Sequence, residues 1–296
     1  MMQSIEEYLK DLRSALKASD SATIRDALSD AEEHLRNAVA SLREAQPELT
    51  EAQALEQAVE QYGTPAETAA AYAEVERRTV PALAAQERRV SSSPLRRFFG
   101  IYEDPRAWGT MLYMVISLVT GIVFFTWVVT GLSLSVSLSL FIFGLPLAIL
   151  FLLSVRALAL LEGRLVEALL GERMPRRPLF SGQSTKLLER LKALVMDRHT
   201  WLAMIYMVLQ LALGILYFTL VVTVFSLSVA FMALPLFQSI WIEGVILIGN
   251  TRIFLPVWSY PLVILFGFLL WTVFMHVSRG IGRLHGKYAK ALLVSE

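Results

Sequence analysis

The apolar stretch TWVVTGLSLSV at residues 126–136 returns as TLVVTVFSLSV at residues 219–229. The two copies lie 93 residues apart, and 17 of the 29 positions are identical when residues 108–136 are aligned with 201–229. Polar Thr and Ser residues keep the same register, so a general preference for apolar side chains does not explain the match. We interpret it as the duplication of one membrane-spanning unit.

The sequence that follows each copy supports the duplication. RALALLEGRLVEALLG, which begins at Arg156, resembles RGIGRLHGKYAKALLV, which begins at Arg279. The offset between copies grows from 93 to 123 residues, so the second copy carries an insertion of 30 residues. The insertion must lie between Val229 and Arg279.

Uncharged runs predict four membrane-spanning helices. Residues 109–131 and 132–155 contain no charged side chain and are long enough for two spans, and residues 201–229 and 257–277 provide two more. We place the turn between the first two spans in GLSLSVSLS, so that the repeated SLSV turns in both copies. We expect Pro146 to kink the second span.

Charge predicts the orientation of these spans. Residues 1–81 carry 16 acidic and 8 basic side chains, whereas the rest of the chain carries 10 acidic and 19 basic ones. The stretches 156–198 and 279–290, which follow the two copies, are rich in Arg and Lys and therefore predicted to be cytoplasmic. A rival model with a fifth span at 227–249 would place residues 279–290 outside the cell.

Residues 1–81 predict four amphipathic helices with a small core. Apolar residues at helical spacing predict a first helix that ends near Ala18. Ser21 is the expected N-cap of a second helix, which continues to about Ala45.

Two further helices are indicated by their capping residues. Thr50 and Gln53 have the spacing of a capping box at the start of a third helix, and Gly63 is well placed to end it. Thr64, followed three residues later by Glu67, predicts the start of a fourth helix, which runs to about residue 78.

The stretches YLKDLRSAL, DALSDAEEHLRNAV and EAQALEQAVEQYGTPAETAAAYA resemble the HAAS signalling domain of bacterial membrane proteins over about residues 5–75. A tyrosine-leucine start, an acidic stretch before a helical histidine and a late Gly-x-Pro recur in that family in this order. The resemblance implies a cytoplasmic partner such as a PadR-like transcription regulator or a stress-response protein. His34 and Glu33 point about 100° apart on a helix, so we interpret His34 as structural, not as a metal ligand.

Nearly all of residues 98–294 resemble the four-span sensor domain that is often attached to bacterial histidine kinases. The resemblance rests on WGTMLYMVISLVTGIVFFTWVVTGLSLSV, GLPLAIL, RALALLEGRLVEALLG and DRHTWLAMIYMV. No kinase, DNA-binding or nucleotide-binding segment follows, so we expect any signal to leave through the N-terminal domain or the loops.

These observations predict an all-α integral membrane protein with four transmembrane helices in a tandem two-helix repeat and a small N-terminal cytoplasmic helical domain. The predicted boundaries are a HAAS-like domain at 1–81, a basic juxtamembrane linker at 82–105, membrane repeat 1 at 106–174, a cytoplasmic connector at 175–197, and membrane repeat 2 at 198–296 with an outer insertion near 236–258. We expect the bacterial cytoplasmic (inner) membrane, with both termini cytoplasmic.

The outer insertion is the candidate recognition segment. If Gly249 and Asn250 form a two-residue turn, the residue numbers of each cross-strand pair sum to 499. The candidate recognition residues are Trp241, Glu243, Asn250, Arg252 and Phe254. The alternative is a lid that only caps the helix bundle.

The sequence predicts a non-enzymatic sensor that couples envelope state or an amphiphilic ligand to a cytoplasmic partner. It contains no cysteine, no HExxH and no Gly-x-Ser-x-Gly, and we predict no catalytic residue, metal or cofactor. We expect the lipid bilayer as a partner, and we expect no direct binding of nucleic acid. The sequence does not decide whether the chain forms a homo-oligomer or joins a membrane complex. The alternative function is a small transporter or an accessory subunit, whose path would use polar residues such as Thr120 and Gln210.

Overall fold

The structure, a computed structural model, describes residues 4–78, 81, 83, 93–138, 144–176, 187–240, 246–248 and 251–294. The chain forms two compact units. One unit comprises Met1–Ala84, Thr126–Met207 and Gly286–Glu296, and the other comprises Ala85–Phe125 and Val208–His285. All regular structure in the described residues is helical apart from one short hairpin, which confirms the predicted fold class. The boundaries predicted along the chain are not tested by these units and stay predictions.

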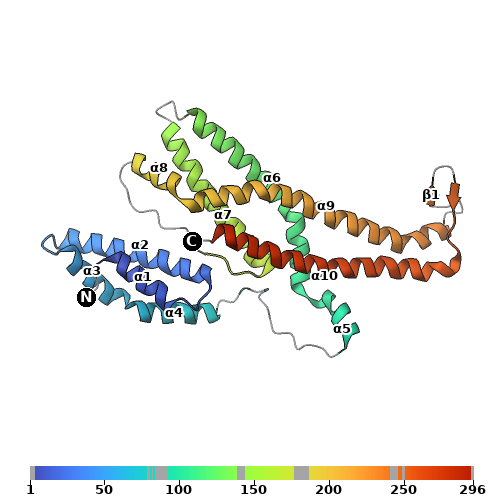
Figure 1. The fold of residues 1–296 in the computed structure, drawn as a ribbon, viewed down its shortest axis with the longest axis horizontal. Helices are drawn as coiled ribbons and strands as arrows, with labels where there is room; N and C mark the ends of the chain where they lie inside the picture. The colour runs from blue at the N-terminus through green and yellow to red at the C-terminus, as the bar shows by residue number, and fades with distance from the viewer. Residues whose placement is uncertain are drawn as a thin grey trace. The chain divides into compact units, whose positions relative to one another are not determined.

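The N-terminal helices are α1 (Ile5–Ala15), α2 (Ser21–Ala45), α3 (Glu51–Tyr62) and α4 (Pro65–Arg78), drawn in blue to cyan in Figure 1. Helix α2 packs against α3, and α1 packs against α4. Their apolar stripes meet in a core that includes the fully buried side chains of Tyr8, Leu12 and Leu35. The Tyr8 hydroxyl also bonds to the hydroxyl of Thr68 at 3.0 Å, which joins α1 to α4.

The predicted caps of the third and fourth helices are confirmed. Thr50 and Gln53 form a reciprocal capping box at α3, and Gly63 follows α3 with a φ of 106°. The Glu67 carboxylate accepts the backbone N–H of Thr64 at 2.9 Å, and the Thr64 hydroxyl accepts the N–H of Glu67 at 3.4 Å. These contacts satisfy backbone groups that have no partner inside a helix.

Two predicted boundaries of the first helices are wrong. Helix α1 ends at Ala15 instead of near Ala18, because the chain turns there and still delivers Leu16 to the core. The N-cap of α2 is Asp20 and not Ser21, since the Asp20 carboxylate accepts the N–H of Ala22 at 2.9 Å.

The rest of the described chain contains four helices that are long and apolar enough to cross a membrane, as predicted. They are α6 (Pro105–Leu138), α7 (Gly144–Leu170), α9 (Arg198–Ile240) and the segment Val257–Leu293, which contains η2 (Val257–Ser259) and α10 (Tyr260–Leu293). Three shorter helices accompany them: α5 (Pro94–Phe99), η1 (Gly100–Glu103) and α8 (Leu187–Met196).

The predicted turns at SLSV are wrong. Helix α6 continues through residues 133–136 to Leu138, and α9 continues through 226–229 to Ile240. A helix satisfies all of its own backbone groups in lipid, so continuing it past a few serines costs less than breaking it. Pro146 does not kink α7 from within, because it is the third residue of that helix and lies in the first turn, where no intrahelical N–H bond is made.

Helices α6 and α9 approach each other closely at two equivalent glycines. A Cβ atom on Gly121 would lie 2.7 Å from the carbonyl oxygen of Gln210, and a Cβ on Gly214 would lie 2.3 Å from that of Ser117. Gly121 and Gly214 are related by the 93-residue offset of the repeat, and so are Ser117 and Gln210. The duplicated sequence therefore forms a crossing in which each helix makes the same close contact with the other.

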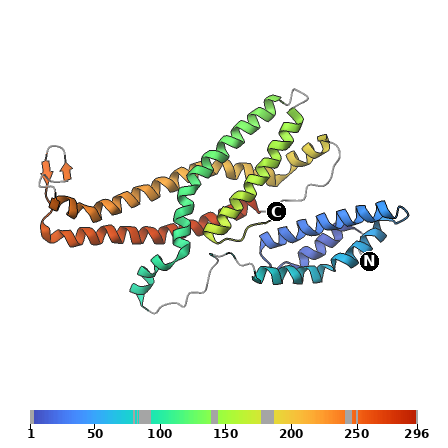
Figure 2. The ribbon, with the colours of Figure 1, turned by 180° about the vertical axis from the view of Figure 1, so that it is seen from behind.

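Helices α9 and α10 lie side by side in both views and lead to the hairpin at their shared end (Figures 1 and 2). Gly267 lets α10 approach the backbone of α9, since a Cβ there would lie 2.7 Å from the carbonyl oxygen of Ser228. Phe225 meets Trp271, and Phe231 meets Phe266, both edge to face.

The hairpin has the predicted register. Strand β1 (Ile246–Ile248) pairs antiparallel with β2 (Thr251–Ile253), and the partners are Ile246 with Ile253, Leu247 with Arg252, and Ile248 with Thr251. The described residues of 227–249 do not form a separate fifth span, because residues 227–240 continue α9 and residues 246–248 are a strand.

Candidate functional site

The duplicated unit places an arginine–aspartate pair at the start of α6 and another at the start of α9. Asp197 caps α9 and accepts a hydrogen bond from Arg156 of α7 at 2.6 Å. Asp104 precedes α6 and pairs with Arg279 of α10 at 3.0 Å. The aspartates are related by the 93-residue offset and the arginines by the 123-residue offset, so the two pairs are equivalent positions of the repeat.

Two buried tyrosines make equivalent contacts as well. Tyr113 of the first repeat bonds to Nε2 of His285 at 2.6 Å, and Tyr206 of the second repeat donates to Glu162 at 2.9 Å. His285 and Glu162 are related by the 123-residue offset, so each tyrosine bonds to a residue of the opposite repeat. Each of these four side chains is at most 1% exposed, so the hydrogen bonds are made without competition from water.

Two further polar side chains complete the cluster around His285. Gln210 donates to the Tyr113 hydroxyl at 3.0 Å, and Tyr217 bonds to Nδ1 of His285 at 3.1 Å. Gln210, which the transporter alternative assigns to a path, is fully buried in this cluster. The cluster joins α6, α9 and α10, and its described side chains form a structural hydrogen-bond network.

The chain turns back on itself directly after α7. Gly171 has a φ of 74°, a conformation that glycine adopts readily, and it redirects the segment that follows. Met174 is fully buried and lies next to Gly163 of α7. This folding back places Arg173 and Arg176 against the N-terminal domain.

Asp26 of α2 is the centre of the candidate site, which we call the docking contact. Its carboxylate accepts the backbone N–H of Arg176 at 2.8 and 3.0 Å and the guanidinium of Arg173 at 3.3 Å. Asp26 is 6% exposed. Charge-assisted hydrogen bonds of this kind are stronger than neutral ones, and a buried carboxylate requires them.

Glu167 of α7 holds the two arginines from the other side. It pairs with Arg176 at 2.8 Å and with Arg173 at 3.4 Å, and it is itself 7% exposed. Two arginines therefore lie between a carboxylate of the spans and a carboxylate of the N-terminal domain. These ion pairs therefore connect the N-terminal domain to helix α7.

The end of α10 contributes the second half of the docking contact. Arg25 donates to the carbonyl oxygen of Leu293, and Lys290 pairs with Asp20, the N-cap of α2. Burial lowers the pKa of the Arg25 guanidinium, and the nearby carboxylates of Asp26 and Asp197 oppose that shift. Helix α2 is therefore bonded to the segment that follows α7 in repeat 1 and to the end of α10 in repeat 2.

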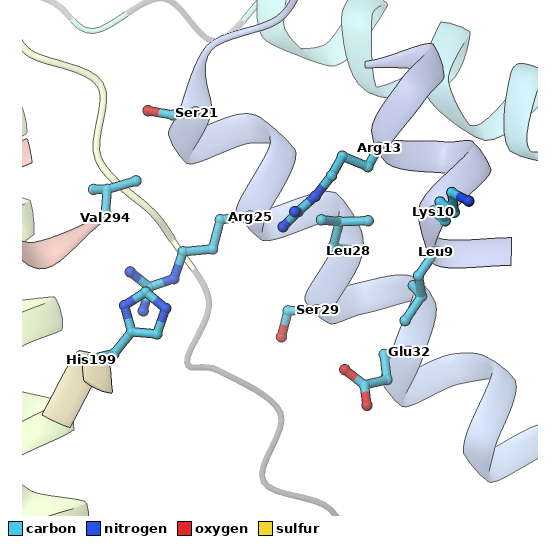
Figure 3. A pocket seen from close by; sticks show the side chains of 10 residues that line it. All are labelled: Leu9, Lys10, Arg13, Ser21, Arg25, Leu28, Ser29, Glu32, His199 and Val294. Atoms are coloured by element: carbon cyan, nitrogen blue, oxygen red, sulfur yellow. The ribbon is translucent and has the colours of Figure 1, made fainter. Parts of the chain in front are cut away.

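A cavity of about 410 Å³ lies beside the docking contact (Figure 3). It is lined by Leu9 and Lys10 of α1, by Arg25 and Leu28 of α2, and by His199 near the start of α9, together with further residues of α1, α2 and the chain end. Figure 3 shows the Arg25 side chain extending toward His199. Among the described residues, no group of three or more His, Asp or Glu could hold a metal ion.

The predicted recognition residues of the insertion are only partly placed. Trp241, Glu243 and Asn250 lie outside the described residues. Arg252 stands opposite Leu247 in the hairpin, and Phe254 is 54% exposed. The described structure brings none of them together in a pocket, and their role in recognition stays a prediction.

His34 and Tyr62 form a ring contact on the surface of the N-terminal domain. His34 is exposed and stacks on Tyr62 with ring centroids 4.6 Å apart, which agrees with a structural role. The Asp30 carboxylate accepts the hydroxyls of Tyr72 at 2.6 Å and Tyr62 at 3.3 Å, so Tyr62 is fixed from two sides.

Sequence reasoning missed the docking contact. By composition, the stretch GERMPRR indicates only a basic segment that follows a membrane span. Gly171 followed by clustered arginines is nevertheless a signal for a chain that turns back. The equivalent ion pairs could have been found, because Asp104, Asp197, Arg156 and Arg279 keep their places in both copies.

Comparison with known families supports both parts of the chain. The family model described as "Putative sensor" matches residues 113–293, and the HAAS model matches residues 7–71. No curated protein and no solved structure matches the chain. The two matches confirm the predicted fusion of a HAAS domain with a four-span sensor domain.

Proposed function

We propose, since this chain belongs to the Sensor family over residues 113–293, that it is a non-enzymatic membrane sensor whose spans control the availability of its HAAS domain. A role in sensing and signalling follows from the two families, and four apolar helices make the chain a multi-pass membrane protein. The coupling between spans and domain is our proposal. The observation that carries it is Asp26, buried between Arg173 and the backbone of Arg176.

The geometry of the docking contact makes it responsive to the spans. Asp26 is held by residues that follow α7, whereas Asp20 and Arg25 are held by residues at the end of α10. A shift between these two helices would pull the two halves of the contact apart. Because buried ion pairs depend steeply on geometry, a small displacement would release α2.

The proposed stimulus is envelope state or an amphiphilic ligand, and the proposed partner is a cytoplasmic protein. Residues 1–81 have a net charge of −8, with 16 acidic and 8 basic side chains. A released acidic domain would attract a basic surface at long range. By resemblance to HAAS proteins, that partner would be a PadR-like regulator or a stress-response protein. The basic stretches after each repeat favour the cytoplasmic side of a bacterial inner membrane for this domain.

The experiment compares three chains in affinity purification from native membranes: the wild type, Asp26→Asn and a deletion of residues 1–81. Asn can still accept the N–H of Arg176, but the charge that holds Arg173 is lost. We expect Asp26→Asn to recover several times more of the cytoplasmic partner than the wild type, and the deletion to recover none.

The matched control is Asp11→Asn, which removes an exposed carboxylate from α1 with the same change of charge. It should behave as the wild type. Recovery of the same proteins with and without residues 1–81 would show that the N-terminal domain does not recruit the partner. Equal recovery by wild type and Asp26→Asn would show that the docking contact does not regulate it.

A further inference from the structure

Three cationic side chains line the cavity beside the docking contact. Lys10 and Arg13 reach it from α1 and Arg25 from α2, while Glu32 is the one carboxylate among the described residues that line it. His199 of α9 adds an imidazole ring. Ser21 and Ser29 add hydroxyl groups. A cavity with this lining offers many hydrogen-bond donors and little negative charge of its own, as an anion-binding site does.

Two buried nitrogens of this lining have no hydrogen-bond partner within the described part of the chain. They are Nε of Arg25 and Nδ1 of His199. Buried polar atoms are nearly always hydrogen-bonded in folded proteins, so unpaired nitrogens on two side chains of the lining point to a missing partner. Because both nitrogens have almost no accessible surface, an anion in the cavity would accept a hydrogen bond from either of them only after that side chain rotates.

The cavity also has an apolar part and lies at the ends of two spans. Leu9, Leu28 and Val294 line it together with the cations. His199 is the second residue of span α9, and Val294 follows the last residue of α10. The cavity therefore lies where α9 begins and α10 ends, beside helices α1 and α2 of the N-terminal domain.

We propose that this cavity binds a phosphate ester, held by Arg13, Arg25, Lys10 and His199. Its volume of about 410 Å³ equals that of roughly a dozen water molecules, which is enough for a phosphate with a glycerol-sized substituent. The guanidinium groups of Arg13 and Arg25 suit the tetrahedral oxygens of phosphate. The phosphate can come from an anionic phospholipid headgroup or from a soluble phosphate ester.

The bound phosphate would join the N-terminal domain to the spans at a second point. It would contact α1 and α2 on one side and α9 on the other, beside the ion pairs of Asp26. The inference goes beyond the proposed function, since binding in the cavity can be measured in the absence of any cytoplasmic partner. A failure of partner recruitment would leave it untouched.

The test uses the full chain in nanodiscs and two kinds of probe. Native mass spectrometry measures how much phosphatidylglycerol the chain retains from discs of phosphatidylcholine and phosphatidylglycerol. Titration calorimetry measures binding of glycerol 3-phosphate and inorganic phosphate to the chain in discs of phosphatidylcholine alone. The variant is Lys10→Gln with Arg13→Gln, two exposed positions of α1 whose substitution leaves the core of the N-terminal domain intact.

The control is Lys17→Gln with Arg43→Gln, which removes the same charge from exposed positions of the domain that do not line the cavity. Retention of phosphatidylglycerol by wild type and control, reduced about tenfold or more in the variant, supports the site with a lipid as its source. Binding of glycerol 3-phosphate or phosphate without retention of phosphatidylglycerol, and its loss in the variant, supports the site with a soluble source. Binding of neither probe, or an equal loss in variant and control, overturns the proposal.

Discussion

Glu162 and His285 occupy the same position in the two membrane repeats, and each is hydrogen-bonded to the tyrosine of the opposite repeat. The tyrosines, Tyr206 and Tyr113, are themselves equivalent. Duplication of a two-span unit thus produced a structure in which each copy satisfies buried polar groups of the other. One copy retains an acid and the other a base at this position, so the two sites differ in chemistry although their geometry is shared.

Replacement of Tyr206 by Phe should destabilise the membrane body. The change removes the hydroxyl that donates to Glu162, which is fully buried. Loss of a hydrogen bond to a buried acceptor costs about 1–3 kcal/mol, measured as the free energy of unfolding in detergent micelles. In a Glu162→Ala background the same change should cost less, because the acceptor is already absent. Equal costs in both backgrounds would show that the hydroxyl does not stabilise the Glu162 side chain.

Replacement of Gly214 by Ala should separate α6 from α9. The new Cβ would meet the carbonyl oxygen of Ser117 at 2.3 Å, and backbone on both sides leaves no flexible side chain to move. Overpacking of this kind costs about 1–3 kcal/mol, which thermal unfolding in micelles would detect. Gly280→Ala is the matched control, because no described atom lies within 4 Å of the place that its new Cβ would occupy, and alanine favours the helix. Similar unfolding temperatures for both variants would contradict the crossing.

The local features of the chain were predictable from the sequence, and the reason is physical. Capping residues act within three or four positions, so Thr50 with Gln53 and Thr64 with Glu67 could be recognised without the fold. The hairpin register followed from one two-residue turn, because a turn fixes all of the pairs after it. The spans followed from runs of uncharged residues, since a charge in lipid is costly.

The positions at which helices end, and the contacts between distant segments, were less accessible. SLSV was expected to turn because serines are common in turns, but in a span the helix is the conformation that satisfies the backbone. The contact of Asp26 with Arg176 joins residues 150 positions apart and leaves no periodic signal. A single aspartate on an acidic helix cannot be distinguished by sequence pattern from its solvated neighbours.

Acid should loosen the junction between α7 and α9 through Asp197. Burial would raise the pKa of this carboxyl, but hydrogen bonds from Thr200 and the pairing with Arg156 outweigh burial and lower its pKa below the ordinary value of 3.8. A carboxylate with a lowered pKa contributes stability that is complete above its unfolded value and is lost as the pH falls through its folded value. Stability should therefore hold at neutral pH and fall below about pH 4.

The measurement is the unfolding temperature of wild type and Asp197→Asn between pH 7 and pH 3. Asn cannot titrate, so the variant should start less stable and lose less between these limits. The difference between the two chains should shrink as the pH falls. A constant difference over the whole range would contradict the assignment of the acid response to Asp197.

The orientation of the spans can be tested with single cysteines, because the chain contains none of its own. Four spans return the chain to the side on which it began, so the N-terminal domain and both basic stretches share one side. The hairpin between α9 and α10 then lies on the other side. Trp258, next to the hairpin, is 73% exposed, and Met196, at the end of α8, is 74% exposed.

Trp258→Cys should react with a membrane-impermeant thiol reagent in intact cells, whereas Met196→Cys should react only after lysis. The reason is the positive-inside rule: short loops rich in Arg and Lys are retained in the cytoplasm, and we expect this of the basic stretches after each repeat. The similar exposure of the two sites makes their labelling directly comparable. Reaction of Met196→Cys in intact cells would place the docking contact outside the cell, where a cytoplasmic partner could not reach the released domain.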